Sequence, residues 1–128
     1  MRMRVTRNRF ERLVRDVTAG VLNSMPAELR ARAEQVTVVV ADRPTHLQRD
    51  LTDGDEELVG LYEGVSLVER HVDNMEAVAD RIILFREPLI ESSETLAELK
   101  AEIRVTLLHE LGHYFGFEED DLEKRGLR

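Results

Sequence analysis

Residues 95–116 carry the start signal, the apolar stripe and the stop signal of one long helix. Ser92, Ser93 or Thr95 can cap its start, and Thr95 with Glu98 has the spacing of a capping box. We expect the helix to run to about Phe115, because Gly116 is placed to end it in the left-handed conformation. Its apolar residues recur at helical spacing and mark the face that must be buried: Leu96, Leu99, Ile103, Leu107 and Leu111.

The remaining elements are predicted to be two helices and three strands. Apolar periodicity over 8–24 predicts an amphipathic helix, and a proline followed by an acid predicts a short helix over about 26–33. Apolar runs predict strands at Val36–Val40, Leu58–Gly64 and Arg81–Arg86, and the first of these runs is β-branched almost throughout. The order of helix, helix, strand, strand, strand and helix indicates an α+β fold.

The segments between these elements contain proline, glycine and acidic residues. Asp42-Arg43-Pro44 should close the first strand and Glu87-Pro88 should stop the third. The glycines within Leu58–Gly64 indicate a bulge or a close backbone approach. The polar segment Thr45–Glu57 is predicted to be a loop. It contains Asp53-Gly54-Asp55, which lacks the spacing of an EF-hand, and we assign it no metal.

Composition limits the class of protein. The 128 residues contain no cysteine, 18 Lys and Arg and 26 Asp and Glu, with a formal net charge of −8. One domain over residues 1–128 is expected at this length. Without cysteine, a disulfide framework, a thiolate nucleophile and a cysteine-ligated zinc are excluded, so any metal must be held by His, Asp and Glu.

Neither membrane insertion nor secretion is expected. The longest apolar stretches, such as Val36–Ala41 and Ile82–Phe85, are far shorter than the ~20 residues that span a bilayer. The basic N-terminus is followed by Phe10-Glu11-Arg12 where a signal peptide needs an apolar region. We therefore expect a cytoplasmic protein without a membrane partner.

Charge is distributed unevenly along the chain. Residues 1–35 carry eight arginines against four acids, a net +4, which leaves −12 for residues 36–128. Outside the N-terminal helix no basic cluster is present, so no nucleic-acid partner is expected. The arginine cluster itself is interpreted as a solvated helix face, with a small anion or RNA patch as the alternative.

The helix at 95–116 also carries the residues with chemical potential. His109 and His113 lie four positions apart, ~40° around a helix, so both imidazoles can reach one ion from one face. Glu110 projects beside them, where it can take a proton from a water that zinc has acidified toward a pKa of ~7 and return it to a leaving amine. The pattern predicts one Zn²⁺ per chain, with Glu110 as the general base.

A zinc site of this kind needs a third protein ligand. A reversal at Gly116 would bring Glu119 to the position of the third ligand in an extended HExxHxxGxx(H/D/E) motif. Asp120 and Asp121 are close enough to compete with it.

Three further residues have less specific patterns. Tyr114 could donate its phenol to a transition-state oxyanion, although packing is the favoured interpretation. His46 and His71 lie in polar contexts without a spaced partner, and we interpret both as surface histidines.

Residues 106–117 (TLLHELGHYFGF), with 58–64 (LVGLYEG), 81–88 (RIILFREP) and 36–44, resemble the family of minimal bacterial zincin-like metallopeptidases. The similarity extends from about residue 8 to residue 122. It implies a reduced zincin core, in which a small mixed sheet lies beside the active-site helix and the N-terminal helix. It also implies zinc on His109, His113 and an acid after Gly116, with Glu110 as the general base.

The leading hypothesis is a zinc-dependent peptidase acting on a peptide or protein. An edge strand such as Leu58–Gly64 could pair with an extended substrate, or with nothing. Larger zincins form the far wall of the substrate cleft from a C-terminal subdomain, and only residues 117–128 follow Gly116 here. A second copy of the chain could supply that wall. The alternatives are a non-catalytic interaction protein stapled by a metal and a small metal-dependent ribonuclease. A deformylase-type amidase would normally need a cysteine ligand.

Overall fold

The computed structural model of the chain describes residues 3–50, 57–64 and 80–117. It has the following elements: α1 (Arg7–Ser24), α2 (Ala27–Ala33), β1 (Thr37–Ala41), α3 (His46–Asp50), β2 (Gly60–Glu63), β3 (Arg81–Phe85), α4 (Arg86–Glu91) and α5 (Leu96–Phe115). The fold is α+β, as the sequence predicts, and it is consistent with a zincin-like fold.

The three strands form a mixed sheet in the order β1-β3-β2. β1 pairs with β3 in parallel, with Val39 opposite Ile83. β2 pairs with β3 in antiparallel orientation, with Leu61 opposite Ile83. In the described part of the chain, β3 is therefore the central strand and β2 forms an edge of the sheet.

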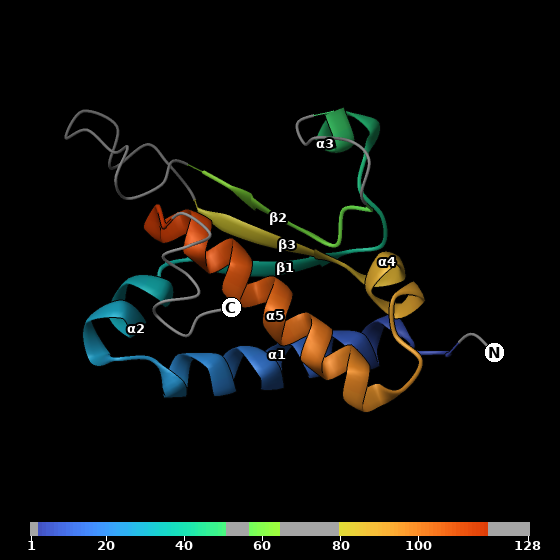
Figure 1. Cartoon of the computed structure of the whole chain (residues 1–128), viewed down its shortest axis with the longest axis horizontal. Coiled ribbons are helices and arrows are strands. Elements are labelled where there is room, and N and C mark those ends of the chain that lie inside the picture. Colours follow the sequence, from blue (N-terminus) through green and yellow to red (C-terminus); the bar gives the residue numbers. More distant parts are fainter. Residues whose placement is uncertain (1–2, 51–56, 65–79, 118–128) are drawn as a thin grey trace.

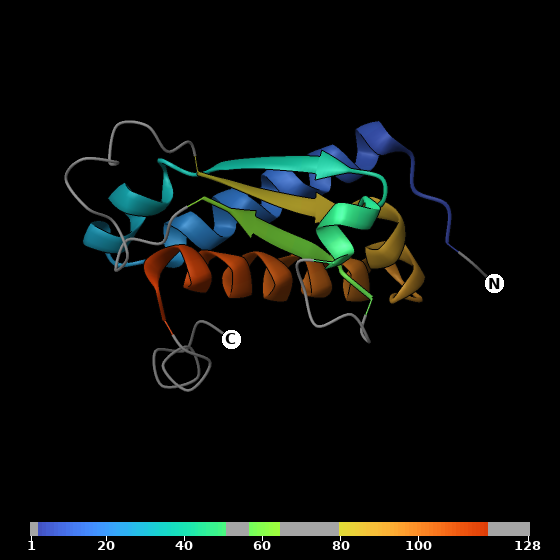
Figure 2. The ribbon, with the colours of Figure 1, turned by 90° about the horizontal axis from the view of Figure 1, so that it is seen from above.

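One face of the sheet is covered by two helices. Figures 1 and 2 show α1 and α5 side by side beneath the strands, with α5 running along β2. Apolar side chains from both helices and from β3 fill the space between the layers, including Phe10, Val14 and Val21 of α1, Ile82 and Leu84 of β3, and Leu99, Ile103 and Leu107 of α5. This packing fixes α5 against the edge strand.

The first two helices agree closely with the predictions. α1 begins after Thr6, whose side chain accepts a hydrogen bond from the Arg9 backbone N–H. α2 begins directly after Pro26. Proline is common at helix starts, because the backbone N–H that it lacks would have no partner within the helix there. The Arg7 side chain donates to the carbonyl of Val40, which ties the start of α1 to β1.

Two short helices were not predicted. α3 begins the segment expected to be a loop, and its start is capped reciprocally by Thr45 and Gln48, each accepting the backbone N–H of the other. α4 follows β3 at once. Pro88 does not prevent this helix, because it lies in the first turn, where proline is tolerated. Glu87-Pro88 therefore accompanies the end of a strand and also the start of a helix. Asp53-Gly54-Asp55 lies outside the described residues.

None of the helices in the described ranges is long and apolar enough to cross a membrane.

Candidate metal centre and active site

Helix α5 positions the three residues of the motif. It begins as predicted, since the Thr95 hydroxyl accepts the Glu98 N–H, although the Glu98 carboxylate accepts the N–H of Glu94 rather than that of Thr95. Its apolar face is buried against α1 and the sheet. Near its C-terminal end, His109 is half-buried, Glu110 is buried and His113 is exposed.

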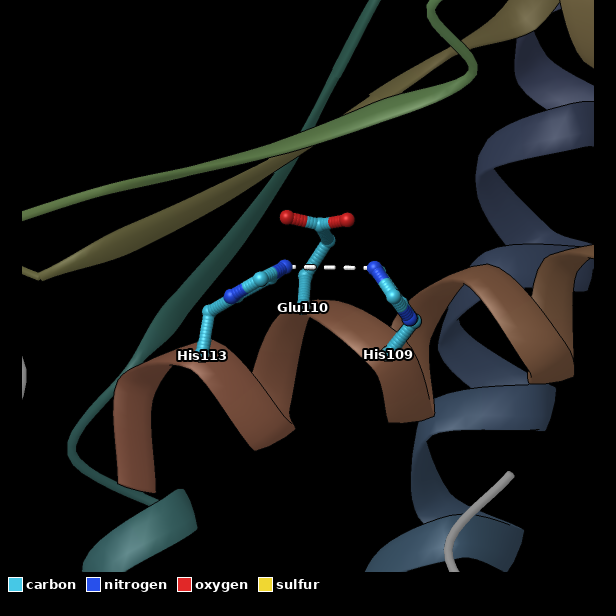
Figure 3. A group of neighbouring side chains, drawn as sticks. All are labelled: His109, Glu110 and His113. Carbon is cyan, nitrogen blue, oxygen red and sulfur yellow. Dashed lines mark hydrogen bonds between the residues drawn. The ribbon is translucent and has the colours of Figure 1, made fainter. Parts of the chain in front are cut away.

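The two imidazoles face each other across one turn of α5. The Nε2 atoms of His109 and His113 lie 3.1 Å apart, and the ring planes are inclined at 85°. Figure 3 shows both rings rising from the helix, with the nitrogens converging between them. Two nitrogens bound to one tetrahedral zinc would be about 3.3 Å apart, so this pair fits a shared metal ion. The ligand atoms of His109, Glu110 and His113 all lie within 4.8 Å of one another.

The Glu110 carboxylate points from α5 toward β2 (Figure 3). Its Oε1 accepts the backbone N–H of Tyr62 at 2.9 Å, and the residue is only 8% exposed. Burial raises the pKa of Glu110 above its usual value, while the His113 imidazole and the Tyr62 N–H act to lower it. The carboxylate is therefore held at the sheet edge in a partly desolvated position.

β2 can come this close to α5 because residue 60 is glycine. A Cβ at Gly60 would lie 2.4 Å from Thr106 Cγ2 and 3.5 Å from Glu110 Cγ. The sequence indicated a bulge or a close approach at the glycines of this strand, and the structure confirms the close approach at Gly60. Tyr62 itself was missed, because a hydrogen bond from a backbone N–H leaves no pattern in the sequence.

The end of α5 also agrees with the prediction. Gly116 adopts the left-handed conformation at φ 82° and ψ 22°. The N–H groups of Gly116 and Phe117 donate to the carbonyls of His113 and Gly112, which is the Schellman arrangement. The predicted third ligand Glu119 and its competitors Asp120 and Asp121 lie outside the described residues.

The other candidates lie apart from the histidine pair or beyond the described residues. The hydroxyl of Tyr114 donates to the backbone carbonyl of Arg32, and the side chain is 2% exposed, a geometry that favours the packing role. His46 is exposed on α3, and His71 lies outside the described residues.

The fold and the site together define a class of protein, since an HExxH-like helix lies against the edge of a small mixed sheet. The model of the zincin-like metallopeptidase family matches residues 33–127, and the chain belongs to this family. The match includes all three strands and the whole of α5. A comparison with curated proteins finds no match to this chain.

Proposed function

We propose that this protein is a cytoplasmic zinc-dependent peptidase that hydrolyses peptide bonds with Glu110 as the general base. The observation that carries the proposal is the pair of histidine nitrogens 3.1 Å apart on α5, next to a buried carboxylate. Membership of a zincin-like metallopeptidase family supports the same reaction class.

His109 and His113 would hold the ion, with Glu119 as the third ligand and Asp120 or Asp121 as its alternatives. Histidine nitrogen with one carboxylate oxygen is a donor set that suits zinc and leaves a position for water or substrate. When bound, the zinc ion would supply Lewis acidity toward water and toward the peptide carbonyl.

Glu110 would move the proton. Its Oε1 is held by the Tyr62 N–H, and among the described residues its Oε2 has no hydrogen-bond partner. Oε2 is thus the atom to accept a proton from water as the water oxygen bonds to the carbonyl carbon. The same proton then passes to the amide nitrogen as the C–N bond breaks. Because burial raises the pKa of Glu110, its pKa lies closer to neutral pH, which favours both halves of this transfer.

An extended peptide would lie along the edge of β2 that no strand of the described residues pairs with. The N–H of Phe85 donates to the carbonyl of Val59. In an antiparallel pair the backbone N–H and C=O groups of every second residue face the same neighbour, so those of Leu61 and Glu63 also face β3. Those of Gly60 and Tyr62 alternate to the other side, where Tyr62 meets Glu110. A substrate backbone that pairs along this edge, beside the half-buried residues that follow the buried Gly60, would lie next to the base. We therefore expect peptides in extended conformation as substrates.

The deciding experiment measures zinc content and digestion of a peptide library by wild type, Glu110→Gln and Glu102→Gln. Glu102 lies on α5 two turns before the motif and serves as the matched control. We expect one zinc per chain in all three proteins, with cleavage by wild type and Glu102→Gln alone. Retained cleavage by Glu110→Gln would reject Glu110 as the base. Zinc at one per chain without cleavage by wild type would favour the non-catalytic interaction protein.

A further inference from the structure

Tyr62 connects two carboxylates that lie on different elements. Its backbone N–H donates to Glu110 on α5, and its hydroxyl donates to Oδ1 of Asp80 at 2.6 Å. Asp80 directly precedes β3 and is only 8% exposed. The side chain of Tyr62 is thus anchored at its tip, and its backbone lies over the Glu110 carboxylate.

Gly64 leaves the space that the Tyr62–Asp80 hydrogen bond occupies. A Cβ at residue 64 would lie 2.5 Å from Asp80 Oδ1 and 2.7 Å from the Tyr62 hydroxyl. The backbone of Gly64 has φ 150°, a conformation that side-chain-bearing residues rarely adopt. Glycine at position 64 is therefore favoured for two reasons: it leaves room for the Tyr62–Asp80 hydrogen bond, and it can adopt the positive φ.

The ring of Tyr62 is also fixed from the side of α5. It meets the ring of Tyr114 edge to face, with 5.9 Å between the centroids. Tyr114 is buried one turn beyond Glu110 on the same helix. The ring contact and the hydroxyl bond together hold β2 against the part of α5 that carries the motif.

We propose that Tyr62 and Asp80 are positioning residues for Glu110: the bond between their side chains keeps the Tyr62 N–H on the Glu110 carboxylate. The catalytic consequence rests on the proposed peptidase function, while the positioning itself does not. A base that must take a proton from water and deliver it to an amine works only within a narrow range of positions, so a small displacement of β2 lowers the rate.

Two substitutions remove the hydrogen bond between the Tyr62 and Asp80 side chains and leave the backbone N–H of residue 62 in place. Tyr62→Phe removes the donor and keeps the ring, and Asp80→Ala removes the acceptor. Asp80→Asn keeps an acceptor oxygen and is the conservative variant. Ser93→Ala is the matched control, because it removes a buried hydroxyl that donates to the carbonyl of Leu89 on α4.

The first measurement is hydrogen exchange of the residue-62 amide, followed by NMR in the metal-free protein. Tyr62→Phe and Asp80→Ala should speed this exchange about tenfold, the order expected for the loss of one hydrogen bond. Asp80→Asn should stay nearer to wild type, and Ser93→Ala should match it. Exchange at the wild-type rate in both Tyr62→Phe and Asp80→Ala would overturn the proposal, whether or not the protein cleaves peptides.

The second measurement is steady-state peptide cleavage by the zinc-loaded proteins. We expect kcat to fall about tenfold in Tyr62→Phe and Asp80→Ala at an unchanged KM and zinc content. Faster amide exchange with an unchanged kcat would overturn the catalytic part of the proposal. A wild type that cleaves nothing would instead contradict the proposed function, and the amide exchange would still decide whether Tyr62 and Asp80 position Glu110.

Discussion

Gly60 on β2 lies against Thr106 on α5 so closely that a Cβ on residue 60 would be 2.4 Å from Thr106 Cγ2. Thr106 precedes Glu110 by one helical turn on the same face of α5. This close approach sets the separation between the edge strand and the helix. Two residues further along β2, the Tyr62 N–H reaches Glu110. The contact between Gly60 and Thr106 is therefore a structural condition for the arrangement of the site.

Gly60→Ala should destabilise the protein. The new methyl group would enter a filled space, and overpacking of this kind costs about 1–3 kcal/mol. The free energy of unfolding measured in urea would test this. Gly20→Ala is the control, because a Cβ at Gly20 in α1 meets nothing within 4 Å, and it should stabilise the helix by about 0.5–1 kcal/mol.

A second substitution, Thr106→Ser, tests whether the contact with Thr106 causes the loss of stability in Gly60→Ala. This change removes Cγ2, the atom that a methyl group at residue 60 would meet. The double variant Gly60→Ala, Thr106→Ser should therefore be more stable than the sum of the two single effects predicts. Additive effects would mean that the contact with Thr106 is not what excludes a larger residue.

Zinc binding should depend on two of the four histidines. His109→Ala and His113→Ala should each lower zinc affinity more than about 100-fold, since loss of an outer partner of a ligand alone costs about 10–100-fold. The exposed His46 on α3 is the control, and His46→Ala should bind zinc like wild type. Titration with a competing chelator measures all three affinities. Equal affinity in His46→Ala and His113→Ala would contradict a site at the histidine pair.

The third ligand can be identified by comparing neighbouring acids. Glu119→Ala should lower zinc affinity more than Asp120→Ala or Asp121→Ala, because Glu119 is at the position of the extended motif. The same chelator titration applies. If Asp120→Ala has the largest effect, the chain reverses one residue later than the motif spacing predicts.

Much of the fold follows from local patterns in the sequence. Thr95 and Gly116 mark the ends of α5 because a cap and a left-handed residue act within one turn, and the structure has the helix between them. The three strands also follow from short apolar runs. At Leu58–Gly64 the predicted strand exceeds the observed one, because β2 covers Gly60–Glu63 and the apolar Leu58 and Val59 precede it.

The parts that were missed depend on longer-range contacts or on ambiguous signals. Pro88 stops a strand and also fits the first turn of α4, so the sequence alone favours neither. The anchoring of Tyr62 by Asp80 joins residues 18 positions apart, and it depends on sheet packing that periodicity does not describe. The histidine pair could be found because both residues lie on one helix, whereas the strand beside Glu110 comes from a separate part of the chain.

Gly116→Ala should weaken the end of α5. Alanine in the left-handed conformation costs about 1 kcal/mol more than glycine, while asparagine tolerates that conformation better. We expect the order of stability in urea to be wild type, Gly116→Asn, then Gly116→Ala. An equal stability of all three would mean that the Schellman arrangement adds nothing to the fold.

The buried carboxylate of Glu110 should reduce the stability of the metal-free protein at neutral pH. Burial raises the pKa of Glu110 from its ordinary value of 4.5, so the folded protein binds a proton at this group more tightly than the unfolded chain does. The resulting stabilisation is fully present below pH 4.5 and is lost as the pH rises through the folded-state pKa. Glu110→Gln removes this titration and keeps an acceptor oxygen for the Tyr62 N–H. At pH 7 metal-free Glu110→Gln should therefore unfold at a higher temperature than metal-free wild type, and the difference should shrink as the pH falls toward 4. A lower melting temperature for Glu110→Gln at pH 7 would show that the contacts of the charged carboxylate outweigh its desolvation.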